Sequence, residues 1–331
     1  MRPCDKEPTH KKTETEKEAQ ALDKIICIAG PTASGKTALA VELAKELNGE
    51  VVSCDSMYVY RRMNIGTAKP TREEMQGIVH HMIDVCEPTE DFSVSRYTEM
   101  ASPIVDDILS RGKAAIIAGG TGLYMDSLIR GNNFAPVPAT GQREILEAQL
   151  EQDGVNALLT RLQSIDPEAA GKSQGNPRRI IRALEVYLET GETITAHNRR
   201  TQAVPPRYQP LWLGLDFSSR QALYDRIDRR VEIMLQQGLT EEIRQLLASG
   251  IPKNATAMQA IGYKEFVDAL DGKISLAEAA AQVRQSSRRY AKRQLTWFRR
   301  NREIQWLTRQ PDDGLDEILQ KARQVAAIFD K

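Results

Sequence analysis

A phosphate-binding pattern stands near the start of the sequence, between Gly30 and Thr37. Gly30-Pro31-Thr32-Ala33-Ser34-Gly35-Lys36-Thr37 matches G-x-x-x-x-G-K-[ST] at every fixed position. In such a loop, successive backbone N–H groups and a helix N-terminus face an oxyanion. The Lys36 ammonium adds a full charge, and the Thr37 hydroxyl can hold a magnesium ion. The residues therefore predict a polyphosphate site, and the alternative is an ordinary glycine-rich turn.

The flanking residues favour the phosphate site over the turn. Residues 25–29 are an apolar run typical of a buried parallel strand. After the loop, Leu39, Leu43 and Leu47 recur at helical spacing, and Asn48-Gly49 is a typical helix end. The predicted order is therefore strand, glycine loop and helix, which is the context that a phosphate loop requires.

Two further strands are expected to end in polar residues. Residues 50–54 are apolar and lead into Asp55, and residues 112–118 lead into a glycine turn that contains Thr121. Ligands of parallel sheets bind at the carboxyl ends of the strands. Asp55 is therefore expected at the end of the strand next to the phosphate loop, and residues 112–118 beside the first strand. Asp55 is a candidate general base, and its alternative role is to cap the following turn.

Strands and helices alternate along much of the chain, and a helix is expected over residues 94–111. This alternation predicts an α/β protein with a P-loop parallel sheet and helices on both faces. The expected core comprises residues 24–134 and 208–331, and it includes one long helix over residues 219–248. Residues 135–207 are expected to form an inserted all-helical domain, and residues 1–23 a disordered N-terminal extension.

Basic side chains gather in two helical stretches. Arg178, Arg179 and Arg182 lie at the start of a helix in the insert, and Arg284 to Arg302 contains eight Lys/Arg residues and no acid. Such clusters indicate an anionic partner, here the phosphate backbone of a nucleic acid. The alternative for both stretches is a solvated helix face.

Composition restricts the remaining classes. The chain has 331 residues, 41% hydrophobic, and Lys+Arg and Asp+Glu both number 45, so the net charge indicates no partner. Its four cysteines, Cys4, Cys27, Cys54 and Cys86, show no paired C-x-x-C spacing. No apolar run approaches the roughly 20 residues of a membrane span. We expect a cytoplasmic protein that contacts no membrane and acts as a monomer.

A phosphate loop alone serves several chemistries. A P-loop kinase of a small metabolite would show an arginine-rich lid, which the sequence does not place. A nucleotide-gated RNA-binding module would use the basic helices and turn over nothing. A third possibility is any reaction in which a polyphosphate leaves.

Seven collinear stretches resemble the tRNA dimethylallyltransferase family: GPTASGKT, VVSCDSMYVYRRMNIGTAKP, HHMIDV, IIAGGTGLY, NPRRIIRALE, QAIGYKE and AKRQLTWFRR. The resemblance spans residues 25–307. It implies transfer of a dimethylallyl group from dimethylallyl diphosphate to the exocyclic amine of the adenine 3′ to the tRNA anticodon, with no ATP consumed. The sequence lacks the zinc-finger extension of longer eukaryotic relatives, so the bacterial form is the closer resemblance.

The resemblance also assigns residues. Lys36, Thr121 and Arg230 would act on the leaving diphosphate with Mg2+, and Asp55 would take the proton of the amine. The expected contacts with the tRNA anticodon stem-loop are Asp55, Ser56, Met57, Tyr58, Thr121, Arg143, Arg178, Arg179, Ile180, Ile181 and Arg182. At the position of Tyr58 the family commonly has glutamine.

Overall fold

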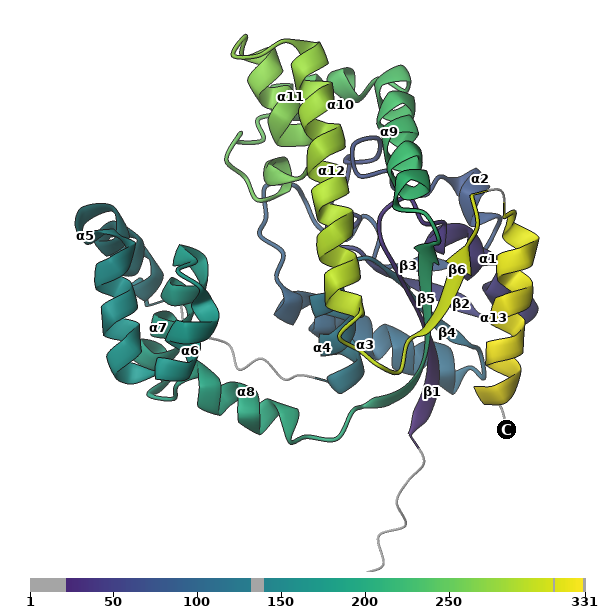
Figure 1. Cartoon of the computed structure of the whole chain (residues 1–331), viewed down its shortest axis with the longest axis horizontal. Helices are drawn as coiled ribbons and strands as arrows, with labels where there is room; N and C mark the ends of the chain where they lie inside the picture. Colours follow the sequence, from purple (N-terminus) through teal and green to yellow (C-terminus); the bar gives the residue numbers. More distant parts are fainter. Residues whose placement is uncertain (1–21, 132–139, 312, 330–331) are drawn as a thin grey trace, which may run out of the picture.

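A six-stranded parallel sheet forms the centre of the molecule (Figure 1). The computed structural model describes residues 22–131, 140–311 and 313–329. In spatial order the strands are β3 (His80–His81), β2 (Glu50–Cys54), β4 (Ala115–Gly119), β1 (Asp23–Ala29), β5 (Tyr208–Phe217) and β6 (Gln305–Arg309). The parallel sheet is confirmed, and so is the pairing of β4 with β1, which aligns Ile26 with Ile116. The extension expected over residues 1–23 lies almost entirely outside the described residues.

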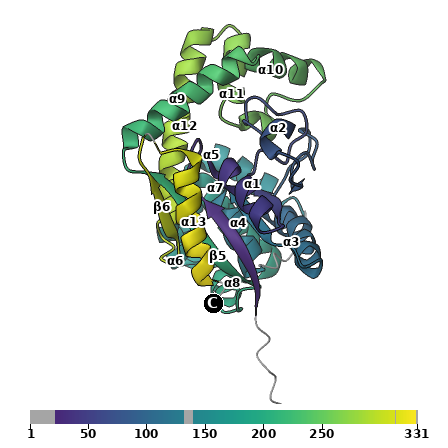
Figure 2. The same cartoon turned by 90° about the vertical axis from the view of Figure 1, so that its right-hand side faces the viewer.

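Helices cover both faces of the sheet, as expected. On one face lie α1 (Lys36–Glu46) and α13 (Leu315–Phe329), and on the other lie α3 (Val94–Ser110) and α4 (Gly122–Arg130) (Figure 1, Figure 2). Side chains of β1 alternate between the two cores, because successive residues of a strand point to opposite faces. Ile26 and Ile28 pack with α1, and Cys27 lies in the opposite core.

A group of helices rises from the carboxyl ends of the strands (Figure 1). It comprises α9 (Arg220–Gln236), α10 (Leu239–Ala248), the short helix η1 (Ala257–Gln259), α11 (Tyr263–Leu270) and α12 (Leu276–Phe298). The short helix α2 (Arg72–Met75) lies below them. The prediction of one helix over residues 219–248 is wrong. Gly238 has φ +95° and breaks it into α9 and α10, because a left-handed residue cannot continue an α-helix.

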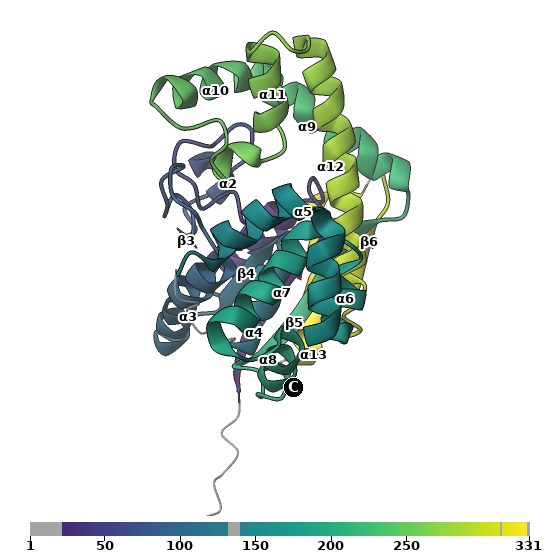
Figure 3. The same ribbon diagram turned by 90° about the vertical axis from the view of Figure 1, so that its left-hand side faces the viewer.

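The insert forms a separate helical module, defined here as α5 (Gln142–Ile165), α6 (Pro167–Ser173), α7 (Pro177–Thr190) and α8 (Ile194–Gln202) (Figure 3). These helices bury their own apolar core, which includes Leu146, Leu162, Ile180 and Leu184. The expected all-helical insert is thus confirmed, while its expected boundary at residue 135 lies outside the described residues. No helix of the described part is long and apolar enough to cross a membrane.

Glu50, the first residue of β2, carries a buried carboxylate at the amino end of this strand. Lys113 Nζ and His81 Nε2 each lie 2.7 Å from it, and Arg111 Nη2 donates to it at 2.9 Å. Hydrogen bonds from Arg111 hold the pKa of Glu50 far below its usual range, although burial acts in the opposite direction. The ionised carboxylate is therefore a stabilising part of the fold.

Glu50→Gln is expected to lower the free energy of unfolding by about 2 kcal/mol at neutral pH, because it removes the charge that pairs these cations. A lowered carboxyl pKa contributes stability above the ordinary glutamate pKa, near 4.5, and loses it as the pH falls through the folded-state value. The difference between wild type and variant should therefore shrink in acid. Urea unfolding at several pH values measures it, and a difference that stays constant below pH 4 would contradict this role.

Candidate active site

A cavity of about 1090 Å3 opens where the phosphate loop meets the rising helices. Its walls come from residues 32–38, residues 55–58, residues 64–71 and the facing sides of α9 and α12. Seven Lys or Arg side chains line it against two acids, Asp55 and Glu74. The cavity is therefore suited to an anion, and it lies at the sheet edge where parallel sheets bind ligands.

The phosphate loop folds as its sequence predicts. Gly35 has φ +96° and precedes α1, whose first residue is Lys36. A φ of +96° strains any residue other than glycine, and a Cβ atom at position 35 would also lie 2.8 Å from the guanidinium group of Arg309. Lys36 Nζ donates to the carbonyl of Pro31 at 2.7 Å, across the loop. Thr32 to Thr37 line the cavity, and Gly30 and Pro31 begin the loop.

Three arginines surround this loop. Arg226 donates to the carbonyl of Ala33 at 3.0 Å, and Arg309 donates to that of Ser34 at 3.2 Å. Arg230, the third, lies in the cavity wall as expected. Arg226 and Arg309 were not predicted, because α9 and β6 are distant from the loop in sequence and the helical pattern does not show which arginines face it.

Two cations of this cavity, Lys36 and Arg226, have lowered pKa values. Burial lowers the pKa of Lys36 to about 8, with Arg230 acting in the same direction and Asp55 against it. Burial also lowers the pKa of Arg226, and Arg309 and Arg230 lower it further. Such shifts mean that the positive charge here is incompletely balanced by the protein, so that binding an anion would be favourable.

Asp55 lies in the cavity wall directly after β2. The expectation that its strand neighbours β1 is wrong, because β4 lies between the two. Its Oδ1 accepts from the backbone N–H of Met57 at 2.9 Å, so Asp55 does cap the following turn. Burial raises its pKa, against the effects of Met57, Lys36 and Arg230. A raised pKa makes the carboxylate a stronger base, which fits the predicted role.

Thr121 follows β4, and its side chain links the carboxyl end of β4 to that of β2. Its Oγ1 accepts from the backbone N–H of Ser56 at 3.0 Å. Tyr58, two residues further along, donates its hydroxyl to the carbonyl of Ala68 at 2.8 Å. Ser56, Met57 and Tyr58 all line the cavity with Asp55. The structure thus gathers the residues of these predicted groups at one edge of the sheet.

Gln294 on α12 is a site residue that the sequence analysis missed. It is buried, its Oε1 accepts from the N–H of Thr32 at 2.8 Å, and its Nε2 donates to the carbonyl of Gly120 at 3.0 Å. Three residues further, Trp297 packs against Gly122 so closely that a Cβ there would clash. One face of α12 therefore fixes the phosphate loop relative to the turn that carries Thr121. Gln294 and Trp297 are three residues apart, a spacing that places them on one face of a helix. The basic residues around them led us to interpret this stretch by its charge alone.

The basic cluster expected over 284–302 is partly neutralised. Arg288 pairs with Asp228, and Arg299 Nη2 lies 2.7 Å from Asp216. Arg293, in contrast, lines the cavity. The cluster is therefore less cationic in the fold than in the sequence, because its acidic partners come from distant segments.

The arginines of the helical module divide into two kinds. Arg178 and Arg179 are exposed at the N-terminus of α7. Arg143 makes two hydrogen bonds of 3.0 Å to Glu185, and Arg182 makes one of 2.8 Å to the same carboxylate. The first kind is available to a phosphate backbone. In the second kind, Arg143 ties α5 to α7, and Arg182 pairs with a residue of its own helix.

Ile180 and Ile181 do not present their side chains to a partner. Both are buried in the core of the helical module, at 0% and 4% exposure. Any contact of these two residues with tRNA would therefore be made by their backbone, and the expectation stays a prediction. Their apolar character serves the face of α7 that packs on α5.

A magnesium ion would find few protein ligands here. No group of three or more His, Cys, Asp or Glu side chains in the described part of the chain could hold a metal. Thr37 and Asp55 do line one cavity with the phosphate loop. Because Mg2+ usually takes one or two protein ligands and completes its shell with phosphate oxygens and water, the residues fit an ion that arrives with a diphosphate.

The sheet, the glycine loop and the cationic cavity together define a P-loop protein, with the carboxylate of Asp55 in the wall of the same cavity. The model of the IPP transferase family matches residues 58–301, more than half of the chain. The chain therefore belongs to the IPP transferase family.

Relatives and solved structures agree. The tRNA dimethylallyltransferase of Thermoanaerobacter sp. (strain X514) is 50% identical over 286 residues, 86% of this chain and 91% of that protein. That of Acetivibrio thermocellus is 44% identical over 310 residues, 93% and 99% of the two chains. The crystal structure of the tRNA isopentenylpyrophosphate transferase from Bacillus halodurans superposes with a TM-score of 0.70 at 43% identity and covers 92% of this chain and 96% of that one. A eukaryotic dimethylallyltransferase described as acting on tRNA gives a TM-score of 0.77 at 30% identity, over 92% and 77%.

Proposed function

We propose that this chain transfers a dimethylallyl group from dimethylallyl diphosphate to the exocyclic amine of the adenine 3′ to the anticodon of tRNA. The observation that carries the proposal is the placement of a phosphate loop and a carboxylate of raised pKa in the walls of one cavity. Membership of the IPP transferase family supports it. A nucleotide-gated RNA-binding module would use the loop but would need no base. A kinase of a small metabolite can use both groups, so membership of the family is what favours the transferase over the kinase.

The phosphate loop acts on the leaving group. Breaking an allylic carbon–oxygen bond leaves a carbocation-like fragment and a diphosphate, so catalysis requires stabilisation of the growing negative charge. Lys36, Arg226 and Arg230 supply fixed positive charges around the loop. Thr37 would hold Mg2+, which would supply further positive charge for the leaving diphosphate.

Asp55 acts on the nucleophile. An aromatic amine becomes a competent nucleophile when its proton is removed, and a carboxylate of raised pKa is suited to accept it. The adenine must first leave the stack of the anticodon loop to reach a residue in a cavity wall. Apolar residues of the same walls, Ile233, Met234 and Ile261, would face the dimethylallyl group.

The proposal includes the cellular setting. Cys27, Cys54 and Cys86 are free thiols buried in the fold, which fits a reducing cytoplasm. One chain supplies both the phosphate loop and the carboxylate, which fits action as a monomer.

The substrates that the protein consumes, with and without tRNA, distinguish the proposed function from its alternatives. A kinase consumes ATP without RNA, and an RNA-binding module consumes neither ATP nor dimethylallyl diphosphate. The proposed transferase consumes dimethylallyl diphosphate only when unmodified tRNA is present. ATP consumption in the absence of tRNA would favour the kinase instead.

Charge reversal at Arg178 and Arg179 is expected to weaken tRNA binding and leave diphosphate binding unchanged. Each phosphate contact that is lost should reduce the slope of log affinity against log salt by about 1, because fewer counterions are released. Adding charge reversal at Arg182 should increase the effect, although it also breaks the pair with Glu185. Titration of tRNA at several salt concentrations measures both quantities.

Arg323→Glu is the matched control. Arg323 is exposed on α13, which Figure 1 shows on the side away from the helical module. Its reversal changes the net charge by as much as each single reversal in the helical module but should leave the salt slope as in the wild type. Equal slopes in all the variants would reassign the helical module to a scaffold.

A further inference from the structure

The segment of residues 63–70, called here the 63–70 loop, contributes residues 64–70 to one wall of the cavity. It has no regular structure, yet it presents a specific backbone group. The carbonyl of Ala68 accepts from Tyr58 Oη at 2.8 Å and from Arg230 Nη2 at 3.0 Å. The position of Arg230 in the cavity therefore depends on where this loop places one carbonyl oxygen.

Glu242 of α10 holds the other end of the loop. Its Oε2 accepts from the N–H groups of Asn64 at 2.9 Å and Ile65 at 2.8 Å, and its Oε1 accepts from that of Gly66 at 3.1 Å. Three successive amides directed at one carboxylate form a backbone nest, a geometry that favours an anion. Hydrogen bonds to an ionised acceptor are also stronger than neutral ones. The carboxylate of Glu242 is thus the anion that the backbone amides of this loop bind.

The surrounding packing fits this contact. Tyr263 is fully buried and donates its hydroxyl to Glu242 Oε1 at 2.6 Å. A Cβ atom on Gly66 would lie 2.5 Å from the Tyr263 ring and 2.8 Å from Leu239, so the loop can approach α10 and α11 only with glycine at position 66. The loop is therefore fitted to these helices as well as hydrogen bonded to them.

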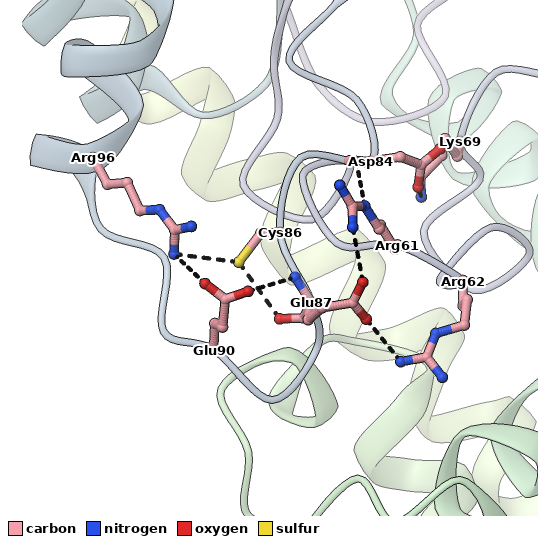
Figure 4. Close-up of polar contacts among 8 residues, drawn as sticks. All are labelled: Arg61, Arg62, Lys69, Asp84, Cys86, Glu87, Glu90 and Arg96. Atoms are coloured by element: carbon pink, nitrogen blue, oxygen red, sulfur yellow. Dashed lines mark hydrogen bonds and ion pairs between the residues drawn. The ribbon is translucent and has the colours of Figure 1, made fainter.

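A second set of contacts anchors the loop at its far end (Figure 4). Lys69 Nζ donates to Asp84 Oδ1 and to the carbonyl of Tyr60, both at 2.6 Å. Arg61 Nε in turn donates to the carbonyl of Asp84 at 2.9 Å. This end is tied to the segment that follows β3, whereas Glu242 ties the backbone of residues 64–66 to α10.

From this geometry we propose that Glu242 is a positioning residue of the reaction, which fixes the 63–70 loop so that the carbonyl of Ala68 aims Arg230 at the diphosphate. The inference rests on the proposed function for its ligand. Glu242 itself does not line the cavity, so it acts only through the loop. A displacement of about 1 Å in such a support can lower a rate about a hundredfold.

Glu242→Gln tests the proposal with minimal change of shape. A carboxamide has one acceptor oxygen and an NH2 group, so it cannot receive all three amides. Backbone hydrogen exchange in the native protein is expected to accelerate at least tenfold at residues 64–66. Exchange at Val52 and Ile117, in the buried strands β2 and β4, should not change and so separates local release from global unfolding.

Glu241→Gln is the matched control. Glu241 precedes Glu242 on α10, is exposed, and contacts Arg244 and Gln245 of its own helix. It should retain wild-type exchange and turnover.

Activity and binding complete the test. Glu242→Gln should lower kcat about a hundredfold and weaken binding of inorganic diphosphate about tenfold, with tRNA affinity and the thermal midpoint close to those of Glu241→Gln. Unchanged exchange at residues 64–66 would overturn the proposal. So would faster exchange with wild-type turnover and diphosphate affinity. A wild-type protein that fails to modify tRNA would sink the proposed function alone, because loop exchange and diphosphate binding would still report on Glu242.

Discussion

Asp55→Asn is expected to lower the rate of dimethylallyl transfer by roughly a hundred- to ten-thousandfold, because it removes the base while it keeps the shape of the side chain. The amide oxygen of asparagine can still accept from the N–H of Met57, so the cap of the turn should survive. The affinities for tRNA and dimethylallyl diphosphate should change little. A single-turnover rate at saturating concentrations of both substrates, with direct binding of each ligand, measures these quantities.

The two roles open to this carboxylate give different results. As the base, Asp55 is needed only after both substrates have bound. As a ligand of magnesium, it would be needed to bind the diphosphate, and Asp55→Asn would lose magnesium-dependent diphosphate binding. That loss would favour the metal role, and a wild-type single-turnover rate would remove Asp55 from the chemistry.

Lys36→Ala is expected to reduce turnover about a hundredfold or more, because it deletes a full positive charge beside the leaving diphosphate. The side chain also bridges the loop to the carbonyl of Pro31. That carbonyl can bind water in the open cavity, so the fold should survive. Turnover measured beside the far-UV circular dichroism spectrum tests both statements, and an active, folded variant would exclude Lys36 from the mechanism.

The pH dependence of the wild type gives an independent check on Lys36. Burial lowers its pKa to about 8, so the amine loses its proton, and its charge, as the pH rises through that value. Affinity for inorganic diphosphate should therefore fall above pH 8 in the wild type. Lys36→Ala should lack this step, and a step of equal size in the variant would assign it to another group.

Local patterns predicted much of this molecule. The strand, glycine loop and helix around Lys36 are determined by residues adjacent in sequence, so the phosphate loop could be predicted from that stretch alone. The helix expected over residues 94–111 is α3, from Val94 to Ser110, and Ser93 caps it by accepting from the N–H of Arg96. The apolar face of α13, which includes Ile318 and Ala322, also has helical spacing, and this helix could have been found in the same way.

What the sequence did not predict depends on distant contacts. The insertion of β4 between β1 and β2 is set by packing of the whole sheet, which no single segment encodes. Gln294 and Glu242 are functional through the backbone amides that they meet, and a sequence does not show which amides will lie opposite. The helical pattern of residues 219–248 does not show where the helix breaks, because a single glycine, Gly238, causes the break.

The proposed function is tested most directly by the identity of its product. The protein is incubated with labelled dimethylallyl diphosphate and unmodified tRNA, without ATP, and the tRNA is digested and its nucleosides are separated. The account predicts label on the exocyclic amine of the adenosine 3′ to the anticodon, with one diphosphate released for each group transferred. Label elsewhere, or none while ATP supports a reaction that needs no tRNA, would contradict it.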